Sequence, residues 1–172
     1  GNSSPTPSLE PESTDFPDYA ATRAAVTGVQ PTASFAEPLP DSIVIVYEAD
    51  EEIVGISTDG TEQVSLTSGS APAWSPDGSQ IAFMRRSGAT DNTDIFVMDA
   101  NGINQINLTN SPATDSYPAW SPDGSQIVFS SIREETGYAE HLYVMNADGS
   151  NVRRITSNDF NKNTDASWSP DG

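Results

Sequence analysis

The sequence contains no cysteine, and this absence excludes a whole group of functions. Disulfides, thiolate metal sites and cysteine nucleophiles all require a thiol. Histidine is nearly absent too, because His141 is the only one, and a single His without Cys cannot form a zinc site of the usual type. Thiol chemistry and ordinary zinc centres are therefore excluded.

Positive charge is scarce, with 7 Lys and Arg against 25 Asp and Glu and a formal net charge of −18. Binding to a phosphate backbone needs clustered Lys and Arg, so we expect neither nucleic acid nor an anionic membrane surface as a partner. No run approaches the roughly 18 apolar residues of a membrane span, so we expect no membrane insertion of these residues. Because the first residue is Gly rather than Met with a leader, we expect a mature product or a fragment.

Large apolar side chains are sparse in residues 1–41, which hold seven of the thirteen prolines. A segment this polar cannot bury enough surface to offset the entropy lost on ordering. We predict a disordered linker, rich in Pro, Ser and Thr, over residues 1–41, and a folded domain over residues 42–172.

One five-residue string, Trp-Ser-Pro-Asp-Gly, occurs three times at spacings of 46 and 48 residues and uses all three tryptophans. A repeat of this period is typical of propeller blades or solenoid units. Ser, Pro and Asp suit successive positions of a type I turn, so we expect turn chemistry to account for Asp and packing between blades to account for Trp. The motif residues are Trp74, Pro76, Asp77, Gly78, Trp120, Pro122, Asp123, Gly124, Trp168, Pro170, Asp171 and Gly172.

From residue 42 onward the chain reads as short β-strands joined by turns. The middle strands of each unit are apolar on both faces, while the last strand alternates, which favours stacked propeller blades over a sandwich. We predict an all-β fold with blades of four antiparallel strands. The units cover about residues 42–69, which lack a leading strand, 70–111 and 115–158, and a further unit starts at 166–172 with a strand from Ala166 to Ser169.

The repeated Pro-Ala-Trp-Ser-Pro-Asp-Gly-Ser-Gln-Ile, followed by Val-Met-Asp/Asn-Ala-Asn/Asp-Gly and Asn-Leu-Thr or Arg-Ile-Thr, resembles the WD-repeat-like unit of TolB-type β-propellers. The resemblance implies a six-bladed ring, of which about three blades are present, in the bacterial periplasm or on the cell surface. It also implies docking of a peptidoglycan-associated lipoprotein and other envelope proteins. TolB itself has an α/β domain before its propeller, which residues 1–41 cannot supply.

The remaining blades have two possible sources. The first unit lacks its leading strand, and the end of the chain offers such a strand with no blade behind it. Either the sequence is part of a longer chain, which we favour, or a second copy joins head to tail so that each copy completes the other's first blade.

The loop Ile132–Glu140 is the one insertion that distinguishes the third unit, and longer loops on a regular scaffold often carry recognition. We predict a partner-binding site there. The turns Asp99–Gly102 and Asn146–Gly149 carry oxygen ligands as a calcium loop does, but they suit hairpin turns better, so we predict no cofactor and keep calcium as an alternative. The predicted partner-binding residues are Arg133, Glu134, Glu135, Tyr138 and His141.

No Gly-x-Ser-x-Gly motif accompanies His141, so we predict that the chain is not an enzyme. Our hypothesis is a non-catalytic, protein- or peptide-binding propeller module of the bacterial cell envelope, periplasmic or extracellular, with a membrane or lipid anchor left open. Two alternatives are the propeller domain of a prolyl-oligopeptidase-like hydrolase and the extracytoplasmic sensor domain of a membrane receptor or kinase. A downstream catalytic motif would indicate the first, and an upstream apolar span the second.

Overall fold

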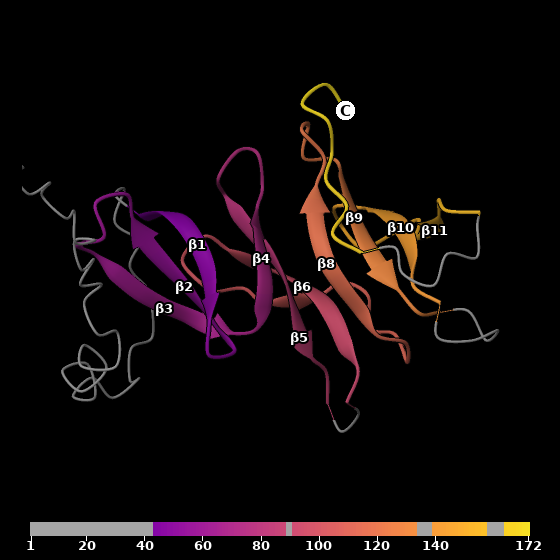
Figure 1. Ribbon diagram of the computed structural model, residues 1–172, viewed down its shortest axis with the longest axis horizontal. Helices are drawn as coiled ribbons and strands as arrows, with labels where there is room; N and C mark the ends of the chain where they lie inside the picture. Colours follow the sequence, from indigo (N-terminus) through magenta and orange to yellow (C-terminus); the bar gives the residue numbers. More distant parts are fainter. Residues whose placement is uncertain (1–42, 89–90, 134–138, 158–163) are drawn as a thin grey trace, which may run out of the picture. The chain divides into compact units, whose positions relative to one another are not determined.

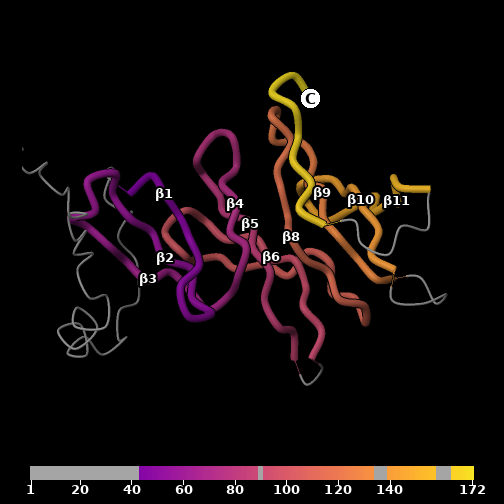
Figure 2. Tube along the Cα trace, viewed as in Figure 1, coloured from indigo at the N-terminus to yellow at the C-terminus, as the bar shows by residue number. Residues whose placement is uncertain are grey.

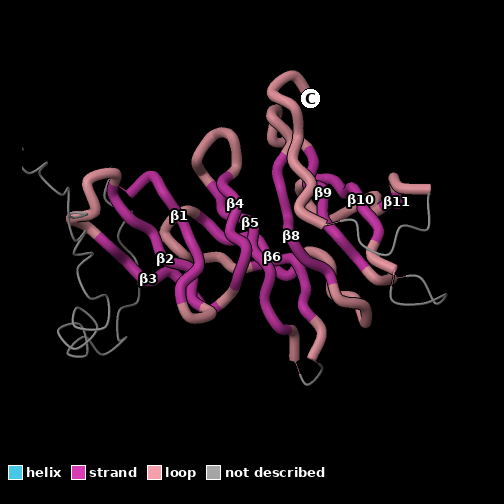
Figure 3. Tube along the Cα trace, viewed as in Figure 1, coloured by secondary structure: helices cyan, strands magenta, loops and turns pink. Residues whose placement is uncertain are grey.

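The described part of the chain consists of β-strands and the turns between them (Figure 3). The computed structural model describes residues 43–88, 91–133, 139–157 and 164–172, all within the unit Phe35–Gly172. Among these residues there is no helix, and hence none that is long and apolar enough to cross a membrane. The linker predicted over residues 1–41 lies outside the described residues.

Three antiparallel sheets follow one another along the chain, one for each predicted unit (Figure 1). Within each sheet, consecutive strands are neighbours, because short turns connect them. The predicted all-β architecture is therefore confirmed. The first sheet holds β1 (Ile43–Ala49), β2 (Glu52–Ser57) and β3 (Gln63–Ser68), the second holds β4 (Ser70–Trp74), β5 (Gln80–Arg86), β6 (Thr93–Asp99) and β7 (Ile106–Asn107), and the third holds β8 (Asp115–Trp120), β9 (Gln126–Ser131), β10 (His141–Asn146) and β11 (Arg153–Arg154).

The apolar core lies between successive sheets, so the second sheet is covered on both faces. Ile81 and Phe83 of β5 pack with Ile53 of the first sheet, while Ala82 of the same strand packs with Phe129 of the third. Side chains alternate across a strand, and burying a side chain of the size of Ile or Phe contributes about 1.5–3 kcal/mol. This arrangement explains why the middle strands carry runs of consecutive apolar residues, such as Ile81–Met84 and Ile95–Met98.

Each later sheet carries an aromatic pair at the same place in its two middle strands. The ring centroids of Phe83 and Phe96 are 5.7 Å apart, and those of Phe129 and Tyr143 are 5.8 Å apart. The repeat in sequence is thus also a repeat in packing, and Figure 2 traces the chain as it passes from one sheet to the next.

In the second and third sheets, the turn before the last strand places a glycine directly against the preceding sheet. A Cβ on Gly102 would lie 3.1 Å from the carbonyl oxygen of Leu66, and one on Gly149 would lie 2.8 Å from that of Leu108. Both glycines have positive φ, at 84° and 83°. Gly is required here both for its backbone conformation and for the close approach of two backbones.

The outer strands are shorter than predicted. The sequence predicts strands over Gln105–Thr109 and Val152–Thr156, but β7 and β11 each contain two residues. Asn104 and Asn151 have φ of 54° and 56°, and this left-handed conformation just before each outer strand delays its start. The strand predicted at Ala166–Ser169 is not formed, since the described structure provides no neighbouring strand with which it could pair.

Candidate functional site

The Trp-Ser-Pro-Asp-Gly turns are held together by their own side chains. Ser75 Oγ donates to Asp77 Oδ1 at 2.6 Å, and the backbone N–H and hydroxyl of Ser79 donate to the same oxygen at 3.0 and 2.8 Å. The turn at 121–125 repeats these three bonds with the same lengths. The serine donors lower the pKa of Asp77 and of Asp123 to about 2. These bonds are the turn chemistry that the sequence predicts.

A further turn of the same construction lies at residues 57–61. Ser57 Oγ donates to Asp59 Oδ1 at 2.6 Å, and the backbone N–H of Thr61 donates to it at 3.1 Å. The sequence predicted a turn here, but not that it has the same hydrogen bonds as the Trp-Ser-Pro-Asp-Gly turns, because this stretch lacks the Trp and the Pro of the motif. The pattern Ser-x-Asp-Gly-Thr is the signal that could have shown it.

Two of the three motif tryptophans pack in or against the core. Trp120 is 9% exposed and packs between the second and third sheets, while Trp74 packs partly buried against the cluster between the first and second. The third copy forms its turn as well, since Gly172 N–H donates to the carbonyl of Ser169 at 3.1 Å. Trp168 donates its indole N–H to the carbonyl of Ala119 at 3.1 Å, so this segment lies against the third sheet.

The predicted partner loop is only partly described. Arg133 points to Asp115 rather than to solvent, and the carboxylate is fully buried. His141 is 2% exposed, with its Nδ1 3.3 Å from the hydroxyl of Thr156. Both residues therefore face inward. The other members of the predicted site, Glu134, Glu135 and Tyr138, lie outside the described residues, so a partner contact in this loop stays a prediction.

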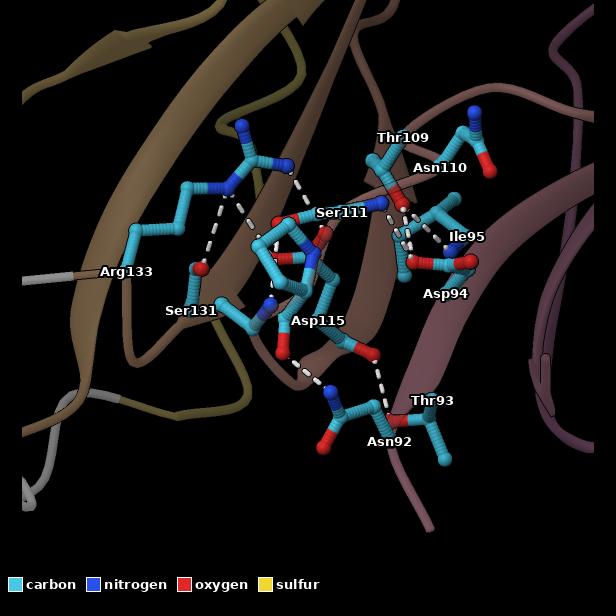
Figure 4. A network of polar contacts seen from close by, with 12 residues as sticks. Asn92, Thr93, Asp94, Ile95, Thr109, Asn110, Ser111, Asp115, Ser131 and Arg133 are labelled. Atoms are coloured by element: carbon cyan, nitrogen blue, oxygen red, sulfur yellow. Dashed lines mark hydrogen bonds and ion pairs between the residues drawn. The ribbon is translucent and has the colours of Figure 1, made fainter. Parts of the chain in front are cut away.

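Two buried aspartates organise a polar network between the second and third sheets (Figure 4). Asp94, which is 0% exposed, accepts from Asn107 at 2.7 Å, from Thr109 at 3.2 Å and from the backbone N–H of Ser111 at 3.0 Å. Burial raises the pKa of Asp94, but these hydrogen bonds together with one from Ser87 outweigh it and hold the pKa below its usual value.

The network crosses to the next sheet at Asp115, whose carbonyl accepts from Thr93 at 2.8 Å. Sequence reasoning missed both aspartates as buried groups. A carboxylate at the head of an otherwise apolar strand, with Thr at the end of the following strand, is the signal that could have found Asp94. Every oxygen involved has a protein donor, so this network stabilises the fold rather than offering a ligand site.

The two turns considered for calcium are occupied by their own hydrogen bonds. Asn104 donates to Asp99 Oδ2 at 2.7 Å, and the backbone N–H of Ser150 donates to Asp148 Oδ1 at 2.9 Å. These are Asx-type turn contacts. Across the described ranges, no group of three or more acidic or His side chains is placed to hold a metal ion.

The first strands of successive units share a backbone irregularity. Ala71, Tyr117 and Asp165, each three residues before a motif Trp, have φ of 48°, 54° and 54°. The pairing of β4 with β5 and of β8 with β9 shifts register at this point. A left-handed conformation costs a non-glycine residue about 1–2 kcal/mol, and such strain often accompanies functional sites.

These three positions and the residues that follow them surround one pocket of about 220 Å³. Tyr117 is 37% exposed, and the backbone N–H of Ala71 donates to Glu48 Oε2 at 3.2 Å, which places a carboxylate beside the pocket. Three repeat units thus contribute equivalent residues to one place, which makes this pocket our candidate site. Its lining residues are Ala71, Pro72, Tyr117, Pro118, Asp165 and Ala166.

Successive sheets, one of three strands and two of four, pack face to face, and the first strands of the second and third sheets, β4 and β8, are in contact. This arrangement defines a β-propeller assembled from repeated blades. The sequence model of the TolB beta propeller domain matches residues 45–172. The chain belongs to this family.

Two solved structures of TolB agree with this assignment. A chain described as TolB from Agrobacterium tumefaciens is 27% identical with a TM-score of 0.59, covering 70% of this chain and 47% of its own length. TolB from Acinetobacter baumannii is also 27% identical, with a TM-score of 0.58, and covers 70% and 30%. An acylaminoacyl peptidase from Pyrococcus horikoshii is 18% identical with a TM-score of 0.46, covering 60% and 20%. The chain spans less than half the length of either TolB chain.

Proposed function

We propose that this chain is a non-catalytic propeller module that binds a protein or peptide in the bacterial cell envelope, in the periplasm or outside the cell. The observation that carries the proposal is the pocket at which three units place an irregular, strained backbone beside the exposed side chain of Tyr117. Bulged strands often serve to direct a side chain at a site. Membership of the TolB propeller family supports the location and the class of partner.

The size of the pocket favours a segment of a polypeptide over a whole small substrate. Pockets that enclose a drug-sized ligand measure about 300–1,000 Å³, which is larger than the roughly 220 Å³ available here. One or two side chains of a peptide would fill it. Tyr117 provides a rigid amphipathic surface that loses little conformational entropy on binding.

The charge of the site favours a basic peptide. Asp165 lines the pocket, Glu48 borders it, and the whole chain carries a net charge of −18. A Lys or Arg side chain over the ring of Tyr117 would gain a cation–π contact as well as attraction to these carboxylates. We therefore expect peptides with one or more Lys or Arg residues to bind best.

A phage-displayed random peptide library, selected on the immobilised chain, tests the proposal. We expect enrichment of Lys and Arg, and an affinity that falls at least about tenfold in Tyr117→Ala. Ile106→Ala is the matched control, because Ile106 is 59% exposed on β7 and lies outside the pocket. Selected peptides that bind Tyr117→Ala as well as the unchanged chain would overturn the assignment of this pocket.

The non-catalytic part of the proposal has its own test. We expect no hydrolysis of fluorogenic peptide substrates by the purified chain. A rate above the blank that follows the protein through successive purification steps, and that disappears on heat unfolding, would contradict it. A purified peptidoglycan-associated lipoprotein, the partner that the family resemblance implies, is a further probe for binding.

A further inference from the structure

The turn between β6 and β7 contains Asn101-Gly102, which is the one Asn-Gly pair in the sequence. An Asn before Gly is prone to deamidation, because a glycine without a Cβ leaves its backbone nitrogen unhindered. In this reaction the nitrogen of Gly102 attacks the side-chain carbonyl carbon of Asn101, and the amide nitrogen of Asn101 leaves as ammonia with the proton from the Gly102 N–H. Water then opens the cyclic imide at either carbonyl, which yields Asp or isoaspartate.

Three hydrogen bonds hold the reacting groups in place in the folded chain. Gly102 N–H donates to the carbonyl of Asp99 at 2.9 Å, and the carbonyl of Gly102 accepts from Nε2 of Gln105 at 2.9 Å. Oδ1 of Asn101 accepts from the backbone N–H of Ile103 at 3.3 Å. The nitrogen that would attack thus has its proton engaged, and the carbonyl that it would attack is bound to a different residue. Formation of the imide must break the first of these bonds and disturb the other two.

The first sheet adds a steric restraint to the same peptide. Gly102 is buried, and a Cβ on it would lie 3.1 Å from the carbonyl oxygen of Leu66 in β3. Little space is therefore left for the peptide between Asn101 and Gly102 to rotate toward the side chain. The reaction requires the first and second sheets to separate at this turn, and a local opening of this kind costs less than global unfolding.

The equivalent turns of the other two sheets carry Asp where this turn carries Asn101. Oδ1 of Asp59 accepts from the backbone N–H of Thr61 at 3.1 Å, and Oδ1 of Asp148 accepts from that of Ser150 at 2.9 Å. An Asp product therefore fits the shape of the turn. Isoaspartate does not fit, because it inserts an extra methylene into the backbone and moves the glycine that follows away from the first sheet.

We propose that Asn101 is a deamidation site that the junction between the first and second sheets protects. The reaction proceeds when this junction opens locally, and it does not require the whole chain to unfold. Isoaspartate, once formed, keeps the turn from docking again, so a single modification makes a transient opening permanent. This proposal does not depend on the peptide-binding function.

The rates of deamidation in the folded and the unfolded chain give the first test. Incubation at mildly alkaline pH, followed at intervals by proteolysis and mass spectrometry, measures the conversion of the peptide that contains Asn101. We expect the conversion to be at least about tenfold slower in the folded chain than in the same chain in urea. Equal rates in the two states, or no conversion in urea, would overturn the proposal.

Two leucines at successive junctions provide matched substitutions. Leu66 belongs to the apolar cluster between the first and second sheets, while Leu108 packs against the cluster between the second and third. Leu66→Ala should speed the conversion of Asn101 at least about tenfold, and Leu108→Ala should change it by less than about twofold. Equal acceleration by both would show that the reaction proceeds from the globally unfolded chain, which contradicts the proposal. Leu66→Val and Leu108→Val repeat the comparison with smaller cavities if the alanine variants do not fold.

The effect of the product on the junction has its own test. The isoaspartate form, separated by chromatography, should lose hydrogen-exchange protection at the N–H of Gly102 and in β3, while the third sheet keeps its protection. Asn101→Asp is the control, because it adds the same charge without lengthening the backbone and should keep the protection at both places. Unchanged protection in the isoaspartate form, or an equal loss in Asn101→Asp, would contradict the effect assigned to the longer backbone.

Discussion

Arg133 and Asp115 form a two-point ion pair in which the carboxylate is completely buried. Nε and Nη2 of Arg133 donate to Oδ1 and Oδ2 of Asp115 at 3.2 and 2.7 Å. The Asp115 side chain is 0% exposed and that of Arg133 is 22% exposed. The guanidinium carbon also lies 5.2 Å from the ring centroid of Phe129. Arg133 thus fastens the residues after β9 to the start of β8.

Removing this arginine should destabilise the chain strongly. In Arg133→Met the carboxylate of Asp115 keeps its buried position but loses both donors, so we expect a loss of about 3 kcal/mol in the free energy of unfolding. Urea denaturation measures it. Arg86→Met is the control, because its ion pair with Asp91 is exposed and should be worth less than about 1 kcal/mol. Equal effects of the two substitutions would contradict a special role for Arg133.

The contact between turn glycine and preceding sheet can be measured by comparing two glycines. Gly60→Ala should cost about 1 kcal/mol, because its φ of 72° strains an L-residue while the space around it is open. Gly149→Ala has a similar φ of 83° and also forces a Cβ to within 2.8 Å of the carbonyl of Leu108. We expect it to cost about 1–3 kcal/mol more in urea denaturation.

Acid should destabilise the chain below pH 4. Hydrogen bonds, of which the one from the preceding serine is the largest contribution, hold the pKa of Asp59, Asp77 and Asp123 at about 2. An unfolded Asp titrates near 3.9, so the unfolded chain binds protons more readily than the folded one. The stabilisation by these turns is therefore complete above about pH 4 and is lost as the pH falls towards 2.

The double substitution Asp77→Asn with Asp123→Asn checks the source of this acid sensitivity. An amide oxygen can still accept the serine hydrogen bonds but does not titrate. We expect the urea midpoint of this variant to fall less than that of the unchanged chain between pH 4 and pH 2.5. An unchanged slope would indicate that other carboxylates dominate.

Replacing Trp120 by Ala should destabilise the chain more than replacing Trp168 by Ala. Trp120 is 9% exposed in the core between two sheets, so Trp120→Ala should cost at least about 3 kcal/mol. Trp168 is only partly buried and rests on one sheet through its bond to Ala119, so Trp168→Ala should cost about 1 kcal/mol. A comparable loss at both positions in thermal unfolding would contradict this difference.

Local chemistry explains how much of the fold the sequence predicts. Ser75, Pro76 and Asp77 form their turn with bonds no more than five residues apart, so the motif by itself specifies the structure. The apolar run of β6 likewise requires cover on both faces. Strand units, turns and the packing of Trp74 and Trp120 were therefore predictable.

The features that the sequence did not predict depend on contacts between residues that are distant in the sequence. Asp115 is buried because Arg133, 18 residues later, returns to it. The left-handed φ of Tyr117 opposes the intrinsic preference of a bulky side chain, so only the register shift between β8 and β9 reveals it. His141 is one of the predicted partner-binding residues, but it is 2% exposed and its Nδ1 lies 3.3 Å from the hydroxyl of Thr156, 15 residues later.

The glycine contacts Gly102 to Leu66 and Gly149 to Leu108 tie each sheet to its immediate predecessor. Stability in such an array is close to a sum of the intrinsic stability of each unit and the coupling between nearest neighbours. Damage at one junction should therefore spread little beyond the two sheets that share it. Gene duplication could lengthen this protein by whole units, because a new unit needs only one glycine that fits the leucine before it and one leucine that accepts the glycine after it.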